Sequence, residues 1–291
     1  MTEDTTHLPI IEARGLSKRY GRGTLALDDV TFTIGSGRIV GLMGANGAGK
    51  TTALKAILGL TPFEGHLQVL GQNPSRERDA LMRDVCFIAD VAVLPKWMRV
   101  SQALDFVSGI HPRFSRTRAE EVLASTDIQL HQRVSQLSKG MITQLHLALI
   151  MAIDAKLLVL DEPTLGLDLL YRRGFYERLL NDYFDHQRTI LVTTHQVEEV
   201  EHLLDHIILL RKGRVVLDCA VSDIEARYVQ VLASPERADA ARAMQPLHER
   251  EVFGRKLFIF ETKDAGSYAG LGEVRTPSIS DLFVALLGEH S

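Results

Sequence analysis

Residues 39–58 read IVGLMGANGAGKTTALKAIL, and this stretch decides the fold. The apolar run at 39–43 predicts a buried strand, and residues 52–58 predict a helix. Between them, GANGAGKT at 44–51 matches the phosphate-binding loop pattern GxxxxGK[ST] without interruption. The order of strand, loop and helix separates a phosphate-binding loop from an ordinary glycine-rich turn.

The residues of this loop are suited to hold the phosphate groups of a nucleotide. Glycines let successive backbone N–H groups point at phosphate oxygens, and the positive end of the following helix adds to the attraction. Lys50 supplies a positive charge for the outer phosphates, and the Thr51 hydroxyl is placed to ligate Mg²⁺. The predicted nucleotide-binding residues here are Gly44, Ala45, Asn46, Gly47, Ala48, Gly49, Lys50, Thr51 and Thr52.

A second apolar run is followed directly by two acidic residues. Residues 157–160 read LLVL and are followed by Asp161 and Glu162. In open α/β sheets ligands bind at the carboxyl ends of the strands, where these two side chains should lie. We predict that Asp161 holds the Mg²⁺ shell through water and that Glu162 orients and activates the attacking water.

Composition limits the classes of protein to consider. The chain has 291 residues, 45% of them hydrophobic, and a formal net charge of −4, which does not favour a general electrostatic grip on nucleic acid. Cys86 and Cys219 are far apart and indicate neither a disulfide scaffold nor a zinc site. The polar N-terminus does not resemble a secretion signal, and no apolar run reaches the roughly 20 residues of a membrane span. We expect a soluble, cytosolic protein that meets a membrane only through a partner.

The periodicity of the chain predicts an α/β frame with a helical insert. Strands are expected at 10–13, 25–34, 67–70 and 85–89, helices at 101–108, 117–125 and 141–153, and strands again at 157–160, 189–193 and 206–210. The first two of this last group should precede helices, as βαβ units require. A hairpin at 214–217 follows, and then a small α+β portion with strands at 229–232 and 257–260 and helices at 235–244 and 280–287.

The order of the motifs resembles the nucleotide-binding domain of ATP-binding cassette (ABC) proteins. The chain gives the phosphate loop, then SQLSKGMITQLHLAL at 135–149, LVLDEPTLGLD at 158–168 and LVTTH at 191–195. The resemblance covers about residues 8–218. It implies a P-loop NTPase fold of the ABC type spanning residues 1–218, with a helical insert at about 91–155 and a small C-terminal α+β domain at 219–291.

This resemblance implies further roles for individual residues. Tyr20 matches the aromatic residue that stacks on adenine, although a lone tyrosine beside a glycine also suits an ordinary surface position. Ser138 and Gly140, expected just before a helix, match the signature that contacts the γ-phosphate of ATP held by another cassette. Asp168 matches the loop along the dimer seam, and His195 matches the switch histidine, which contacts both the γ-phosphate and the catalytic glutamate.

Two positions depart from the family pattern. The signature reads LSKGM, with Lys139 and Met141 where the commonest form has glycine and glutamine. The strand at 85–89 leads to Asp90, where the family usually has a glutamine. The shorter carboxylate of Asp90 can still ligate Mg²⁺ or its water, and we take Asp90 as the candidate for that role.

His202 and His206 mimic the spacing of metal ligands on a helix. Because His206 is expected to begin a strand, the two side chains need not share a face. We therefore do not predict a metal at this pair.

The sequence thus predicts an ATP- and Mg²⁺-dependent ATPase subunit of an ABC transporter. One chain carries one phosphate loop and one signature, so a second cassette must complete each site, and a separate transmembrane permease must supply the pathway. The LSKGM signature and the short C-terminal portion resemble export systems. The alternatives are a non-transport ABC ATPase acting on ribosomes or DNA, which the single cassette and net charge of −4 disfavour, and a regulatory ATPase.

Overall fold

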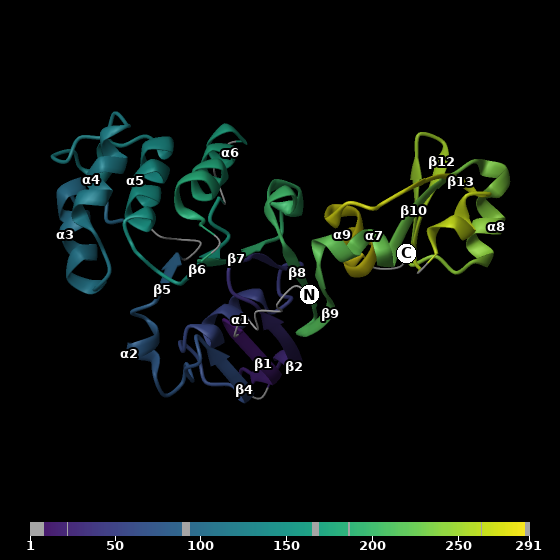
Figure 1. The fold of residues 1–291 in the computed structure, drawn as a ribbon, viewed down its shortest axis with the longest axis horizontal. Helices are drawn as coiled ribbons and strands as arrows, with labels where there is room; N and C mark the ends of the chain where they lie inside the picture. Colours follow the sequence, from purple (N-terminus) through teal and green to yellow (C-terminus); the bar gives the residue numbers. More distant parts are fainter. Residues whose placement is uncertain are drawn as a thin grey trace, which may run out of the picture.

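The computed structural model describes residues 9–21, 23–88, 94–164, 169–185, 187–262 and 264–288. Its central element is a six-stranded sheet of order β5-β6-β7-β3-β8-β9, in which β9 alone runs antiparallel to its neighbour (Figure 1). The strands are β3 (Ile39–Met43), β5 (Val85–Ile88), β6 (Leu157–Asp161), β7 (Thr189–Thr194), β8 (His206–Arg211) and β9 (Arg214–Ala220).

Three central strands are buried along their whole length. Every residue of β3, β6 and β7 is buried, as expected for parallel strands covered on both faces. In the register, Met43 pairs with Thr194, and Asp161 pairs with Thr193. The carboxyl ends of these three strands therefore meet at one edge of the sheet, which confirms the placement predicted from the sequence.

A second, antiparallel sheet of order β2-β1-β4 lies beside the first (Figure 1). Its strands are β1 (Ile11–Arg19), β2 (Leu25–Ile34) and β4 (Glu64–Val69). Helix α1 (Lys50–Ile57), which follows the phosphate loop, places Leu54 and Ile57 in the same apolar cluster as the inward residues of this sheet. This cluster fixes the helix that carries Lys50. The short helix α2 (Arg78–Leu81) precedes β5.

The three predicted helices between β5 and β6 are confirmed. They are α3 (Val100–Ile110), α4 (Arg116–Ala124) and α5 (Lys139–Met151), with a 3₁₀ turn at Val134–Gln136. Leu104, Leu123 and Leu145 belong to an apolar cluster that is separate from the one around α1. This part of the chain therefore has a core of its own.

One predicted helix is wrong. After β6 the chain forms α6 (Leu169–Arg178) and a π turn (Leu179–Tyr183), but after β7 it forms the 3₁₀ turns Val197–Glu199 and Glu201–Leu203. Apolar residues recur here every three positions, at Val197, Val200 and Leu203, and all three pack on the core. This spacing suits the three-residue turn of a 3₁₀ helix better than an α-helix.

The C-terminal part forms an antiparallel sheet of order β11-β12-β10-β13. Its strands are β10 (Tyr228–Ala233), β11 (His248–Val252), β12 (Arg255–Glu261) and β13 (Gly272–Arg275), of which β11 and β13 were not predicted. The short helix α7 (Ile224–Arg227) leads into this sheet. The helix expected at 235–244 is a 3₁₀ turn followed by α8 (Ala238–Ala243).

Helix α9 (Ile279–Leu287) lies between this sheet and the six-stranded sheet (Figure 1). Leu282 of α9 and Ile259 of β12 share an apolar cluster with Ile207 of β8, so packing is continuous from one sheet to the other. Among the described ranges, no helix combines the length and hydropathy that a bilayer crossing requires.

Candidate functional site

The phosphate loop connects the end of β3 to the start of α1. Gly49, which precedes α1, has a φ of +111°, a value that residues with a side chain rarely adopt. A Cβ added there would lie 2.6 Å from the carbonyl oxygen of Ala26, so the close approach of two backbones also requires glycine. The loop is tied to the β8–β9 turn, because the Gly213 amide donates to the Ala48 carbonyl at 2.9 Å.

Lys50 lies inside the loop and is 7% exposed. Its ammonium donates to the Gly44 carbonyl at 2.7 Å and to the Ala45 carbonyl at 3.5 Å. The same nitrogen lies 3.6 Å from Oε1 of Glu162. The buried ammonium of Lys50 is thus held by carbonyl oxygens and one carboxylate. It is positioned to bind an anionic phosphate group in this loop.

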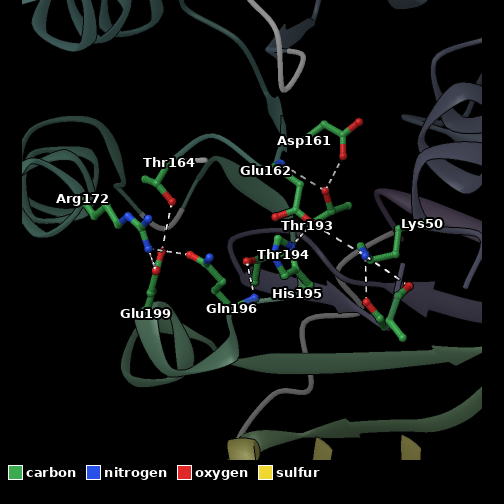
Figure 2. Close-up of polar contacts among 12 residues, drawn as sticks. Lys50, Asp161, Glu162, Thr164, Arg172, Thr193, Thr194, His195, Gln196 and Glu199 are labelled. Atoms are coloured by element: carbon green, nitrogen blue, oxygen red, sulfur yellow. Dashed lines mark hydrogen bonds and ion pairs between the residues drawn. The ribbon is translucent and has the colours of Figure 1, made fainter. Parts of the chain in front are cut away.

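Glu162 and His195 form a contact pair at the ends of β6 and β7 (Figure 2). Nδ1 of His195 lies 3.0 Å from Oε1 of Glu162, the oxygen that faces Lys50. Glu162 has a φ of +48°, an uncommon conformation for a residue with a side chain. Its amide donates to the Thr193 carbonyl at 3.1 Å, which helps to hold that conformation.

Asp161 is buried at the end of β6. Its Oδ1 accepts a hydrogen bond from the Thr193 hydroxyl at 2.6 Å, and the two residues pair across the β6–β7 ladder. The hydroxyl of Thr193 therefore orients the carboxylate of Asp161. Its backbone carbonyl accepts from the amide of Glu162, which carries the second carboxylate. Sequence reasoning did not identify Thr193, because the motif shows it as an ordinary strand residue.

Most of the predicted residues line one pocket of about 600 Å³. Tyr20 lines this pocket and is 47% exposed, with the Lys18 ammonium 5.0 Å from the centre of its ring. The lining residues are Tyr20, Ala26, Asn46, Gly47, Ala48, Gly49, Lys50, Thr51, Thr52, Glu162 and His195. The fold thus gathers an aromatic ring, a phosphate loop and a histidine–glutamate pair around a space of nucleotide size.

Other predicted residues lie elsewhere. Ser138 and Gly140 are not among the described residues that line this pocket. Ser138 caps α5 by accepting from the Met141 amide at 3.2 Å, but Gly140 is the second residue of the helix and not, as expected, in front of it. Asp90 and Asp168 lie outside the described residues.

A polar network that was not predicted lies on the other side of Glu162 and His195 from Lys50 (Figure 2). Arg172 of α6 donates to Gln196 at 2.6 Å and pairs with Glu199, and Thr164 donates to Glu199 at 3.2 Å. Thr164 also contacts the Tyr176 hydroxyl, whose pKa is raised by burial, so that this hydroxyl stays protonated. The contacts join residues up to 35 positions apart, so no local pattern could reveal them.

An apolar groove of about 550 Å³ lies between β5, α3 and α5. Phe106 and Ile110 of α3 line it and are largely exposed. Burial raises the pKa of the Cys86 thiol to about 12 and lowers the pKa of His146, so both groups are uncharged at neutral pH. Because most of the described lining is apolar, the groove is suited to an apolar segment.

Comparison with known proteins gives a consistent family. The family model described as "ABC transporter" matches residues 27–165. The chain is 34% identical over 308 residues to Nod factor export ATP-binding protein I of Rhizobium johnstonii, covering 96% of this chain and 95% of that protein. The protein of the same name from Burkholderia lata is 32% identical, with 96% of this chain and 97% of that protein covered.

The fold agrees with solved structures. A structure described as the ATP-binding subunit of an ABC transporter superposes with a TM-score of 0.64 and 27% sequence identity, covering 74% of this chain and 92% of that chain. A bacterial Atm1-family ABC exporter with ATP bound gives a TM-score of 0.63 at 20% identity, which supports the fold alone.

The buried ammonium of Lys50 gives the first prediction. Lys50→Met keeps the length of the side chain and removes its charge, so ATP affinity should fall about 10-fold or more, as expected for the loss of a charge-assisted contact. Isothermal titration calorimetry measures the affinity. Lys55→Met, on the exposed face of the same helix, is the matched control and should bind ATP like the wild type. Equal affinities for both variants would contradict the assignment of the phosphate loop.

Proposed function

This chain belongs to the ATP-binding, ATP-hydrolysing subunits of ABC transporters, and from that premise we propose that it powers export through a separate membrane permease. The observation that carries the proposal is the convergence of Lys50, Glu162 and His195 at one edge of the sheet. Two relatives above 30% identity over 96% of this chain are named for export, which supports the direction of transport.

In the proposed reaction Glu162 orients and activates the attacking water. Its carboxylate lies between Lys50, which would neutralise the outer phosphates, and His195, which would contact the γ-phosphate and hold the carboxylate in place. A positioned base and a positioned cation are the two elements that phosphoryl transfer to water needs most. Tyr20, which lines the same pocket, would stack on the adenine.

We assign Mg²⁺ binding to oxygen ligands at the same edge. Asp161 offers a buried carboxylate fixed by Thr193, and Thr51 offers a hydroxyl at the start of α1. Mg²⁺ is typically bound by one or two protein oxygens together with phosphates and waters, and these two residues would supply the protein oxygens. Asp90 remains the candidate for a further ligand.

We propose that two copies of the cassette meet with ATP between them. Ser138 is exposed at the start of α5, outside the pocket of its own chain, where it could contact ATP held by the other copy. Asp168 would lie along the seam between the copies. The division of the chain into a cassette at 1–218, with a helical insert at about 91–155, and a C-terminal domain at 219–291 belongs to the same proposal.

The permease is proposed to dock in the apolar groove between β5, α3 and α5. The described lining of the groove is mostly apolar, and the groove is large enough for a short amphipathic segment. It lies against Cys86 and Ile88 of β5, next to the strand that ends in Asp161, so docking and chemistry share the sheet. The chain would then sit at the inner face of the cell membrane. The export names of its relatives favour this role over action on ribosomes or DNA and over a purely regulatory ATPase.

The catalytic assignment predicts the behaviour of Glu162→Gln. The variant keeps the shape of the side chain but loses the base, so ATP turnover should fall about 100-fold or more while ATP binding persists. A phosphate-release assay at saturating ATP measures turnover, and titration measures binding. Glu177→Gln, at an exposed position of α6, serves as control and should hydrolyse ATP normally. Turnover of Glu162→Gln within a few-fold of the wild type would remove this residue from the catalytic role.

The proposed dimer predicts that one substitution can block dimer formation without blocking ATP binding. Gly140→Asp places an anion at the signature, so closure on the ATP of the other copy should be blocked by repulsion, while the phosphate loop of the same chain still binds ATP. Light scattering in the Glu162→Gln background, which should trap the closed state, measures ATP-dependent dimer formation. A dimer that forms equally well with and without Gly140→Asp would exclude the sandwich arrangement.

The groove predicts which surface contacts the permease. Ile110 is 64% exposed on α3, and Ile110→Ser should lower the amount of a polytopic membrane protein that copurifies with the tagged chain from detergent-solubilised membranes. Phe253→Ser, at the fully exposed hairpin tip between β11 and β12, is the matched control and should leave copurification unchanged. If Ile110→Ser and Phe253→Ser recover the same amount as the wild type, the groove is not the docking site.

A further inference from the structure

The segment that follows the candidate switch histidine is held from two sides. We call residues 195–203 the switch segment; it comprises His195, Gln196 and the two 3₁₀ turns. Three of its side chains are glutamates, and they point to different elements. Glu199 pairs with Arg172 of α6, whereas Glu198 and Glu201 bond to α9 at the C-terminal end of the chain.

The contact with α9 involves the first turn of that helix. The backbone amide of Ser280 donates to Oε2 of Glu201 at 3.1 Å, and the Ser280 hydroxyl donates to Oε1 of Glu198 at 3.3 Å. The first amides of a helix have no partner inside the helix, and the helix dipole makes this end positive. The Glu201 carboxylate therefore satisfies one of these amides, and the Glu198 carboxylate is held at the same positive end of α9 by the Ser280 hydroxyl.

Apolar packing reinforces these hydrogen bonds. Val197 and Val200 of the switch segment belong to the same buried cluster as Ile279 and Leu282 of α9. Val197 lies in the first 3₁₀ turn and Val200 joins the two turns, so apolar packing and the hydrogen bonds of Glu198 and Glu201 hold the same segment. The segment cannot shift without losing contacts to α9.

Helix α9 is in turn fastened to the C-terminal sheet. Asp281, the residue after Ser280, accepts from Arg250 of β11 at 2.8 Å and from Gln230 of β10 at 3.2 Å. A continuous set of contacts therefore runs from the C-terminal sheet through α9 to Glu201. On the other side, Arg172 holds Gln196, the residue next to His195, and also holds Glu199.

We propose that α9 is a positioning element for ATP hydrolysis, which acts by holding Glu198 and Glu201 so that His195 stays in contact with Glu162. The inference rests on the proposed function, since it takes His195 and Glu162 as the pair that acts on ATP. Glu201 is a positioning residue, because it touches neither the phosphate loop nor the pocket. The C-terminal domain thereby sets the rate of hydrolysis without contacting nucleotide.

The test compares Glu201→Ala, Glu201→Gln and the double variant Glu198→Ala/Glu201→Ala in the full chain. Loss of one or two hydrogen bonds to a carboxylate should lower kcat about fivefold or more in the double variant. KM and the dissociation constant for ATP should stay unchanged, because Tyr20 and the phosphate loop are untouched. Glu201→Gln retains an oxygen acceptor for the Ser280 amide and should restore much of the activity lost in Glu201→Ala.

The matched control is Arg242→Gln, which removes the exposed ion pairs to Asp239 and Glu249 in the C-terminal part and leaves the contacts of Ser280 and Asp281 intact. It should leave kcat at the wild-type level. If the Glu201 variants keep wild-type kcat, or lose ATP affinity and kcat together, the positioning role is wrong. An increase in kcat would also overturn it.

Failure of this inference can be told apart from failure of the proposed function. Glu162→Gln is measured in the same assay. If Glu162→Gln abolishes ATP turnover and the Glu201 variants turn over ATP like the wild type, the role of Glu162 is supported and the positioning role of α9 is wrong. If Glu162→Gln hydrolyses ATP like the wild type, the proposed catalytic role of Glu162 is wrong, whatever the Glu201 variants do.

Discussion

The contact of Glu162 with both Lys50 and His195 is the interaction on which the rest of the structure depends. The three residues come from three segments of the sequence, and they meet because β3 and β6 both pair with β7 in parallel. All three strands end at one edge, so the phosphate loop, the carboxylates and the histidine leave the sheet together. A one-residue slip of β6 against β7 would turn the Glu162 side chain away from Lys50.

The charges at this edge are costly to bury, and the structure offsets that cost with specific partners. Lys50 is held by loop carbonyls and by Glu162, and Asp161 is held by Thr193. Buried charges are stable in proteins when they are paired and hydrogen-bonded. The uncommon backbone conformation of Glu162 fits the same pattern, since strain of this kind is held where the surrounding structure fixes it.

Features carried by local sequence were predictable, and features carried by distant contacts were not. The strand, loop and helix around Lys50 and the strand that ends at Asp161 follow from apolar runs and glycines that stand next to each other in the chain. The pairing of Arg172 with Glu199 joins residues 27 positions apart, so no periodicity reports it. The 3₁₀ turns after β7 were not predicted, because in a short segment apolar residues spaced three positions apart fit both an α-helix and a 3₁₀ helix.

The topology explains why the C-terminal part meets the switch segment. Strands β7 and β8 lie on either side of β3, so residues 195–205 must cross over β3 to connect them. The crossover ends at Asp205, whose side chain accepts from the Ile39 amide at 2.8 Å and whose carbonyl accepts from the Val221 amide at 2.9 Å. Val221 is where the chain leaves β9 for the C-terminal sheet. Val221, at the start of the connection to the C-terminal sheet, is thus hydrogen-bonded to Asp205, at the end of the crossover that begins at His195. This bond keeps the C-terminal part next to the crossover, where α9 contacts Glu201.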